Sequence, residues 1–193
     1  MKRELILAAA VIGLSFSLTG CIKIIDKGTE SLYTGEVEFD ASADSSGDWG
    51  QISQEITDNA KDIAEVLSGD GIGTAAAVSG AGEVTEFITK GPKNILALKI
   101  DGYDGDETFM MQIGSVYSGT AIRDIQSVKS FESFTNQTEW SAYAKALNAE
   151  MHTQIIEPLG LDESVVGKKV SFVGAATISG SEVTITPVTL TVE

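Results

Sequence analysis

The chain has 193 residues, of which 28 are acidic and 13 are basic, so its formal net charge at pH 7 is −15. An acidic balance of this size repels the phosphates of nucleic acids and the headgroups of anionic lipids, which excludes nucleic acid as a partner. There is a single cysteine, so no disulfide can form within the chain. A chain of this length can bury a hydrophobic core without one.

The first 20 residues have the pattern of a secretory signal. A charged start precedes an apolar run, 5–18, which is shorter than the roughly 20 residues that a membrane-spanning helix needs. The run ends in Leu-Thr-Gly directly before Cys21, as in lipoprotein signals, whose cysteine receives a diacylglyceryl group before cleavage; the alternative is an ordinary signal that leaves a free thiol. We expect removal of 1–20, lipidation of Cys21, and a short tether at 21–31.

The mature part, 32–193, is predicted to be one α+β domain. Strand-forming residues that partly alternate predict a strand at 32–39, and the small polar residues of 40–47 predict a loop. Apolar positions three or four residues apart predict a helix from Trp49 to about Ser68, with Asp48 as its N-cap.

The middle of the mature part changes from a helical to a strand pattern. The glycine- and alanine-rich stretch 71–82 is either a short second helix around 74–78 or a mobile loop, and the residues do not decide between them. Strand-like runs separated by Gly-Pro and by an Asp- and Gly-rich turn then predict an antiparallel meander. These runs are 84–90, 95–101 and 107–113.

The last third combines a helix and a hairpin. After an irregular or briefly helical 120–134, we predict a helix over 139–156, capped by Thr135 or Thr138 and ended by Pro158 and Gly160. A hairpin closes the chain, with strands at 170–178 and 183–192. Together the elements indicate a small β-barrel with a helical insertion. The helical part comprises about 48–82 and 138–157, and the barrel about 32–39, 84–125 and 168–193.

Motifs for catalysis or cofactors are missing from the sequence. There is no G-x-S-x-G, no P-loop and no complete G-x-G-x-x-G. The sole histidine, His152, lies beside the apolar stripe of its helix and is interpreted as structural. The acidic loop 101–107 could offer oxygen ligands to Ca²⁺, but a solvated turn explains it better, because the regular twelve-residue calcium pattern is absent. We expect no catalytic residue, no metal and no cofactor.

The candidate ligand-binding residues are Arg123, Asp124, Asn136 and Gln137. Arg123 is the only arginine outside the signal, and its neighbour Asp124 indicates a paired, partly buried guanidinium. The same rigid fork could hold a ligand carboxylate or hydroxyl, although structural pairing is the commoner use. The amides of Asn136 and Gln137 could bind sugar hydroxyls or simply fix a loop.

Several segments resemble an uncharacterised family of predicted periplasmic lipoproteins, domain of unknown function 2291. The resemblance occurs in order along most of the mature chain, at 113–124, 134–137, 146–148, 170–175 and 185–188. It implies a small OB-like barrel with a separate helical subdomain. It also implies a role in carbohydrate uptake, since genes of this family tend to lie near components of sugar ABC transporters. No catalytic residues are established for the family, so the resemblance assigns none to this chain.

The sequence therefore predicts a non-enzymatic, lipid-anchored protein on the extracytoplasmic side of a bacterial membrane. It would bind a small ligand or assist a transport assembly, with ABC transporter components or a sugar-binding protein as partners. Two alternatives remain: a structural or chaperone-like envelope protein, and a hydrolase that uses acidic residues.

Overall fold

The computed structural model describes residues 39–69 and 72–193. The expected signal, the lipidated cysteine, the tether and all of the predicted strand 32–39 except Phe39 lie outside the described residues. The strands are β1 (Lys61–Asp62), β2 (Ala76–Ile88), β3 (Ile95–Ile100), β4 (Thr108–Gln112), β5 (Lys169–Ser179) and β6 (Glu182–Val192). The α-helices are α3 (Ala41–Asn59), α4 (Ile63–Ser68), α5 (Ala121–Ile125) and α6 (Gln137–Met151).

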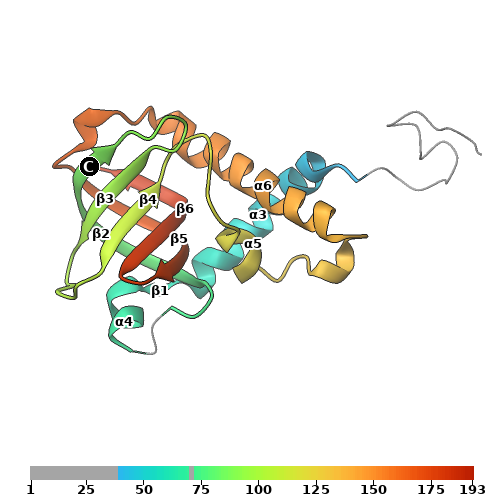
Figure 1. Cartoon of the computed structure of the whole chain (residues 1–193), viewed down its shortest axis with the longest axis horizontal. Helices are drawn as coiled ribbons and strands as arrows, with labels where there is room; N and C mark the ends of the chain where they lie inside the picture. Colours follow the sequence, from blue (N-terminus) through green and yellow to red (C-terminus); the bar gives the residue numbers. More distant parts are fainter. Residues whose placement is uncertain (1–38, 70–71) are drawn as a thin grey trace, which may run out of the picture. The chain divides into compact units, whose positions relative to one another are not determined.

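Strands β2 to β6 form a closed barrel (Figure 1). The strand order is β2-β3-β4-β6-β5, and β5 pairs again with β2 to complete the ring. The meander β2-β3-β4 and the hairpin β5-β6 are antiparallel, as predicted. The pairing of β4 with β6 is parallel, which was not predicted. The long helical connection brings the chain back into the barrel as β5, which runs opposite to β4. After the hairpin, β6 therefore runs parallel to β4.

Strand β2 pairs with both of its neighbours in the barrel, along different parts of its length. Its first half pairs with β5 and its second half with β3, and the register shifts between Val84 and Glu86. At the crossover a Cβ on Gly82 would lie 2.4 Å from the carbonyl oxygen of Lys99, so only glycine permits this approach. The stretch predicted as a helix or loop is therefore strand from Ala76 onward, because small residues let three strands meet there.

Alternating side chains of the barrel strands fill its interior, as the period of a half-buried strand requires. These core side chains include Leu96, Leu98, Phe109, Met111, Phe172 and Ile185. Outward-facing residues of β3 and β4, among them Lys99 and Thr108, are exposed. The β3–β4 pair thus presents an apolar face to the core and a mixed face outward, on which Ala97 and Met110 are partly exposed.

Helices α3 and α6 pack together as a helical arm beside the barrel (Figure 1). Their contact face is apolar and fully buried, and it includes Ile52, Ile56, Tyr143, Leu147 and Met151. Helix α6 continues through a π-helical turn, His152–Ile156, and a 3-10 turn, Glu157–Leu159, to Gly160 in the left-handed conformation, close to the predicted end.

The first helix differs from its prediction at both ends. It begins at Ala41, with Asp40 as N-cap, rather than at 48, so the predicted loop 40–47 is wrong. It ends at Asn59, because Lys61–Asp62 pair with Val78–Ser79 of β2, and Asp62 then caps the separate helix α4. None of the helices in the described ranges combines the length and apolar character that crossing a membrane requires.

Candidate functional site

A pocket of about 370 Å³ lies on the outer face of the β3–β4 hairpin. Residues of β3 and β4 line its floor, and the Asp- and Gly-rich turn between the strands forms one wall. The apolar part of the lining comes from Ala97, Leu98, Ile100, Phe109 and Met110. The side chains that supply polar or aromatic groups to it are Thr85, Lys99, Tyr103, Asp104, Glu107 and Thr108. The pocket therefore combines both charge signs and hydroxyls with the aromatic residues Tyr103 and Phe109.

Tyr103 is fixed in this wall by two contacts. Its hydroxyl donates a hydrogen bond to a carboxylate oxygen of Glu107, and its ring meets the edge of Phe109 with the centroids 5.4 Å apart. The hydrogen bond to Glu107, together with partial desolvation, raises the pKa of Tyr103 to about 12. The phenol thus stays protonated at neutral pH and keeps the ring at the pocket edge, where its face and the carboxylate can both meet a ligand.

The acidic loop 101–107 does not gather its carboxylates around one point. Asp101 forms an ion pair with Lys169 at 2.7 Å, and Glu107 accepts from Tyr103. Across residues 39–69 and 72–193, no three acidic, histidine or cysteine side chains come together as metal ligands. The loop acts as a turn and as the wall of the pocket.

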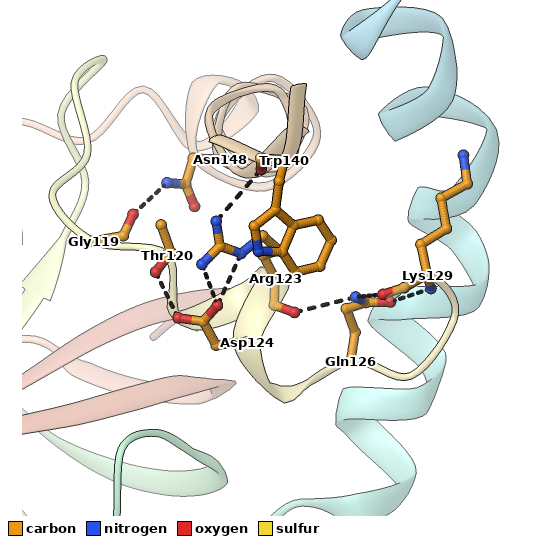
Figure 2. A network of polar contacts seen from close by, with 8 residues as sticks. All are labelled: Gly119, Thr120, Arg123, Asp124, Gln126, Lys129, Trp140 and Asn148. Atoms are coloured by element: carbon orange, nitrogen blue, oxygen red, sulfur yellow. Dashed lines mark hydrogen bonds and ion pairs between the residues drawn. The ribbon is translucent and has the colours of Figure 1, made fainter. Parts of the chain in front are cut away.

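Arg123 and Asp124 form the paired guanidinium that the sequence indicated (Figure 2). The Nη2 and Nε atoms of Arg123 lie 2.5 and 2.8 Å from Oδ1 of Asp124, and the Arg123 side chain is 12% exposed. The guanidinium also lies 4.5 Å from the centre of the Trp140 ring and donates to the Trp140 carbonyl oxygen at 3.4 Å. Thr120 donates to the other oxygen of Asp124 at 2.5 Å.

These contacts connect the barrel to the helical arm. Asn148 of α6 donates to the carbonyl oxygen of Gly119 at 3.2 Å, just before Thr120. Gln126, which follows α5, is buried and donates to the carbonyl oxygens of Arg123 and Lys129 (Figure 2). Because the fork of Arg123 is used by Asp124 and Trp140, its observed role is to fix α5 against α6; a ligand-binding role for Arg123 and Asp124 stays a prediction.

Asn136 is the N-cap of α6, a position predicted for Thr135 or Thr138. Its side-chain oxygen accepts from the backbone N–H groups of Thr138 and Glu139 at 2.9 and 3.0 Å. Glu139 returns a carboxylate to the N–H of Thr135 at 2.8 Å, which is a reciprocal capping arrangement. Gln137 is the first residue of the helix and is exposed. The structure thus places Asn136 in a local structural role.

The four predicted ligand residues belong to two elements, with Arg123 and Asp124 on α5 and Asn136 and Gln137 at the start of α6. Arg123 and Asp124 lie under Trp140, one turn beyond the cap formed by Asn136, whereas the hairpin pocket lies on the barrel. The residues missed by the sequence are Tyr103, Lys99 and Thr85. A tyrosine inside an Asp- and Gly-rich turn that directly follows a strand was the available signal, because such a ring must lie near the sheet surface.

His152 lies at the start of the π-helical turn, half-buried. Its Nδ1 atom lies 2.8 Å from the hydroxyl of Tyr117, and the two rings meet edge to face. This contact fixes the loop that leaves β4 to the end of the arm, which agrees with the structural role predicted for His152.

The five-stranded closed barrel, with its helical connection before the final hairpin, defines an OB-fold protein. The chain is similar to the crystal structure of an OB-fold protein from Thermotoga maritima, with a TM-score of 0.59 and 16% sequence identity. That similarity covers 81% of this chain and 100% of the other, and it shows the fold alone. No match was found among curated proteins.

Residues 68–191 match the model of the DUF2291 family, described as predicted periplasmic lipoproteins. The chain belongs to this family, and the resemblance inferred from the sequence is confirmed. The family description agrees with the expected localisation of a lipid-anchored protein in the cell envelope.

Proposed function

We propose that this lipoprotein is a non-enzymatic accessory of carbohydrate uptake, and that the pocket on the β3–β4 hairpin binds a sugar or a similar neutral polyol. The observation that carries the proposal is the pocket itself: Tyr103 with Glu107 in one wall, and Lys99 with Thr108 in the floor. Sugars present hydroxyls to carboxylates and ammonium groups, and present C–H faces to aromatic rings.

The position of the pocket in the fold supports a ligand-binding role. OB folds use the outer face of their second and third strands for oligosaccharides and oligonucleotides, and β3 and β4 are those strands here. The net charge of −15 disfavours the oligonucleotide. A neutral polyhydroxylated ligand agrees with both observations.

The association with transport rests on the family. The chain belongs to a lipoprotein family, and its resemblance to that family implies genes placed near sugar ABC-transport components. A membrane-tethered domain that binds the transported sugar, or the solute-binding protein that delivers it, would act beside the transporter.

The test is calorimetric titration of the full chain with a panel of neutral mono- and oligosaccharides. We expect Tyr103→Phe and Glu107→Gln each to weaken sugar binding about tenfold, because the first removes the hydroxyl of the pocket wall and the second removes its charged acceptor. Glu65→Gln, which changes an exposed carboxylate on α4, is the matched control and should bind as the parent does.

Three outcomes would overturn parts of this proposal. Absence of heat with every sugar, from protein that is folded by circular dichroism, would overturn the sugar site. Suppression of aggregation of an unfolded test protein in place of sugar binding would favour the chaperone-like alternative. Release of product from chromogenic glycosides, lost in Glu107→Gln, would overturn the non-enzymatic assignment.

A further inference from the structure

Both long helices begin at the end of the helical arm that lies away from the barrel (Figure 1). There the ammonium group of Lys129 forms ion pairs with Asp44 and Asp48, at 3.1 and 3.0 Å, in the first two turns of α3. Asp48 also accepts a hydrogen bond from Tyr143 of α6 at 2.8 Å. The segment around Lys129 is therefore held between the starts of α3 and α6.

An aromatic cluster directly follows this lysine and reaches the surface. Phe131 and Phe134 contact the ring of Trp140, with centroids 6.3 and 5.0 Å apart, and Phe134 also lies 5.1 Å from Tyr143. Phe131 is 46% exposed, whereas Phe134 is buried. The other large apolar side chains that are exposed in the described part of the chain are aliphatic and follow other elements: Val116, Leu159 and Val166.

Trp140, which Phe131 contacts, is partly buried and is held in place by charged neighbours. Arg123 lies over the ring of Trp140 at 4.5 Å and is itself fixed by Asp124. Aromatic side chains that are already fixed lose little conformational entropy when they insert into an apolar environment. Phenylalanine and tryptophan together are also the side chains that favour the boundary between headgroups and acyl chains.

The chain enters the domain at this same end. Asp40 is the N-cap of α3, and the expected lipid on Cys21 precedes it by a segment, 22–40, that reaches at most about 65 Å when extended. A bilayer surface is therefore always within reach of Phe131. The tether raises the effective concentration of that surface, so a weak contact suffices to orient the domain.

We propose that the far end of the helical arm docks on the lipid bilayer, with Phe131 inserted at the level of the headgroups and Trp140 beside it. The carboxylates at this end, Asp40, Glu132 and Glu139, are exposed or only partly buried. They select an electrically neutral lipid surface over an anionic one. Docking would leave the barrel, with its hairpin pocket, directed away from the membrane, and it is independent of what that pocket binds.

The test uses the full-length lipidated protein in vesicles of phosphatidylcholine with brominated acyl chains, which quench nearby tryptophan fluorescence. Trp140 is the reporter, since Trp49 is buried in the arm. We expect the parent protein to be quenched and Trp140→Phe to lose the quenched component. In Phe131→Ser the docked fraction should be about fivefold lower, because about half of the phenylalanine ring is exposed in the free protein and would be buried on docking.

Controls separate docking from folding. Val166→Ser changes a side chain of similar exposure, 45%, away from the cluster and should quench as the parent does. Phe131→Leu keeps an apolar group and should retain docking, and unchanged thermal melts should show that each variant is folded. Anionic phosphatidylglycerol in the vesicles should lower quenching, and added salt should restore it. Unquenched Trp140 in the parent protein, or equal quenching in Phe131→Ser, would overturn the proposal.

Discussion

The barrel and the helical arm are stabilised by different interactions. In the barrel, continuous ladders of backbone hydrogen bonds enclose alternating apolar side chains, and β2 and β5 approach their neighbours closely at glycines. In the arm, an apolar helix–helix contact is supplemented by polar ties from the segment that joins α5 to α6. Added volume should therefore damage the barrel most, whereas loss of charge or of a cap should damage the arm.

A pair of glycine substitutions tests this contrast with the largest expected effect. A Cβ on Gly174 of β5 would lie 2.4 Å from the carbonyl oxygen of Thr186, whereas one on Gly50 of α3 would meet nothing within 4 Å. We expect Gly174→Ala to lower the free energy of unfolding by about 3 kcal/mol, and Gly50→Ala to raise it by about 1 kcal/mol. Urea unfolding measures both. Equal changes in the free energy of unfolding would contradict the expected difference between the barrel and the arm.

Alkaline pH should weaken the arm. Burial lowers the pKa of Lys129, but its hydrogen bonds to Asp48 and Asp44 outweigh this and raise it above 10.5. Burial raises the pKa of Tyr143 above 10, and its bond to Asp48 adds to the shift. Both groups favour the folded state at neutral pH, and this stability is lost as pH rises above about 10.

The Lys129→Met substitution isolates that dependence. We expect it to lower the free energy of unfolding by about 1 kcal/mol at neutral pH and to flatten the decrease in stability above about pH 10. Lys145→Met, an exposed lysine on α6, is the control and should change neither. A variant as pH-dependent as the parent protein would show that the ion pairs do not hold the arm.

Loss of the N-cap of α6 should lower the free energy of unfolding by a similar amount, without a dependence on alkaline pH. Because Asn136 accepts from two backbone N–H groups, Asn136→Ala should cost about 1 kcal/mol of stability. Thr138→Ala, at one of the two positions that the sequence predicted as a cap, should cost less. Thermal melts of the two variants measure the difference, and the reverse order would contradict the assignment of Asn136.

The hairpin pocket should respond to the loss of one charge. Glu107→Gln should lower the pKa of Tyr103 from about 12 toward its ordinary 10, because the hydrogen bond to Glu107 is the largest cause of the shift. Ultraviolet absorbance of the tyrosinate follows this titration. Asp104→Asn should leave it near the parent value; a pKa that stays near 12 in Glu107→Gln would show that burial, and not Glu107, sets it.

The strands of the barrel could be predicted because their sequences alternate and end at clear turns. The runs 84–90, 95–101 and 107–113 and the final hairpin all correspond to observed strands. The first half of β2 could not be predicted, since its alanines and glycines lack the branched side chains of a strand. It is a strand because β5 pairs with it, residue by residue, from Ala76 to Glu83.

The first helix shows how tertiary contacts override local preference. Residues 41–48 are rich in serine and aspartate, which favour turns, yet they are helical because Asp40 caps them and Ser45 and Trp49 are buried. At the other end, apolar spacing continues through Ala60 and Ile63 although the helix stops at Asn59. The spacing of apolar residues indicates which side of a helix is buried, but it does not show where one helix ends and the next begins.

The candidate site was predicted less well than the fold. The pairing of Arg123 with Asp124 is confirmed, because a lone arginine beside an aspartate in an acidic chain has few other stable arrangements. The pocket around Tyr103 was missed, because its residues come from β2, β3, β4 and a turn. Only the registers of these strands bring them together.

The ring of strands has a consequence for the order in which the protein folds. Ala76 pairs with Ala176, and β4 pairs with β6 only after the whole of α6 has intervened. Contacts so distant in sequence make folding slow, because much chain entropy is lost before they form. The sheet formed by β2, β3 and β4 therefore keeps unpaired edges until β5 and β6 pair with it. This interval, when strand edges are free to pair with other chains, is when the protein most needs protection from aggregation.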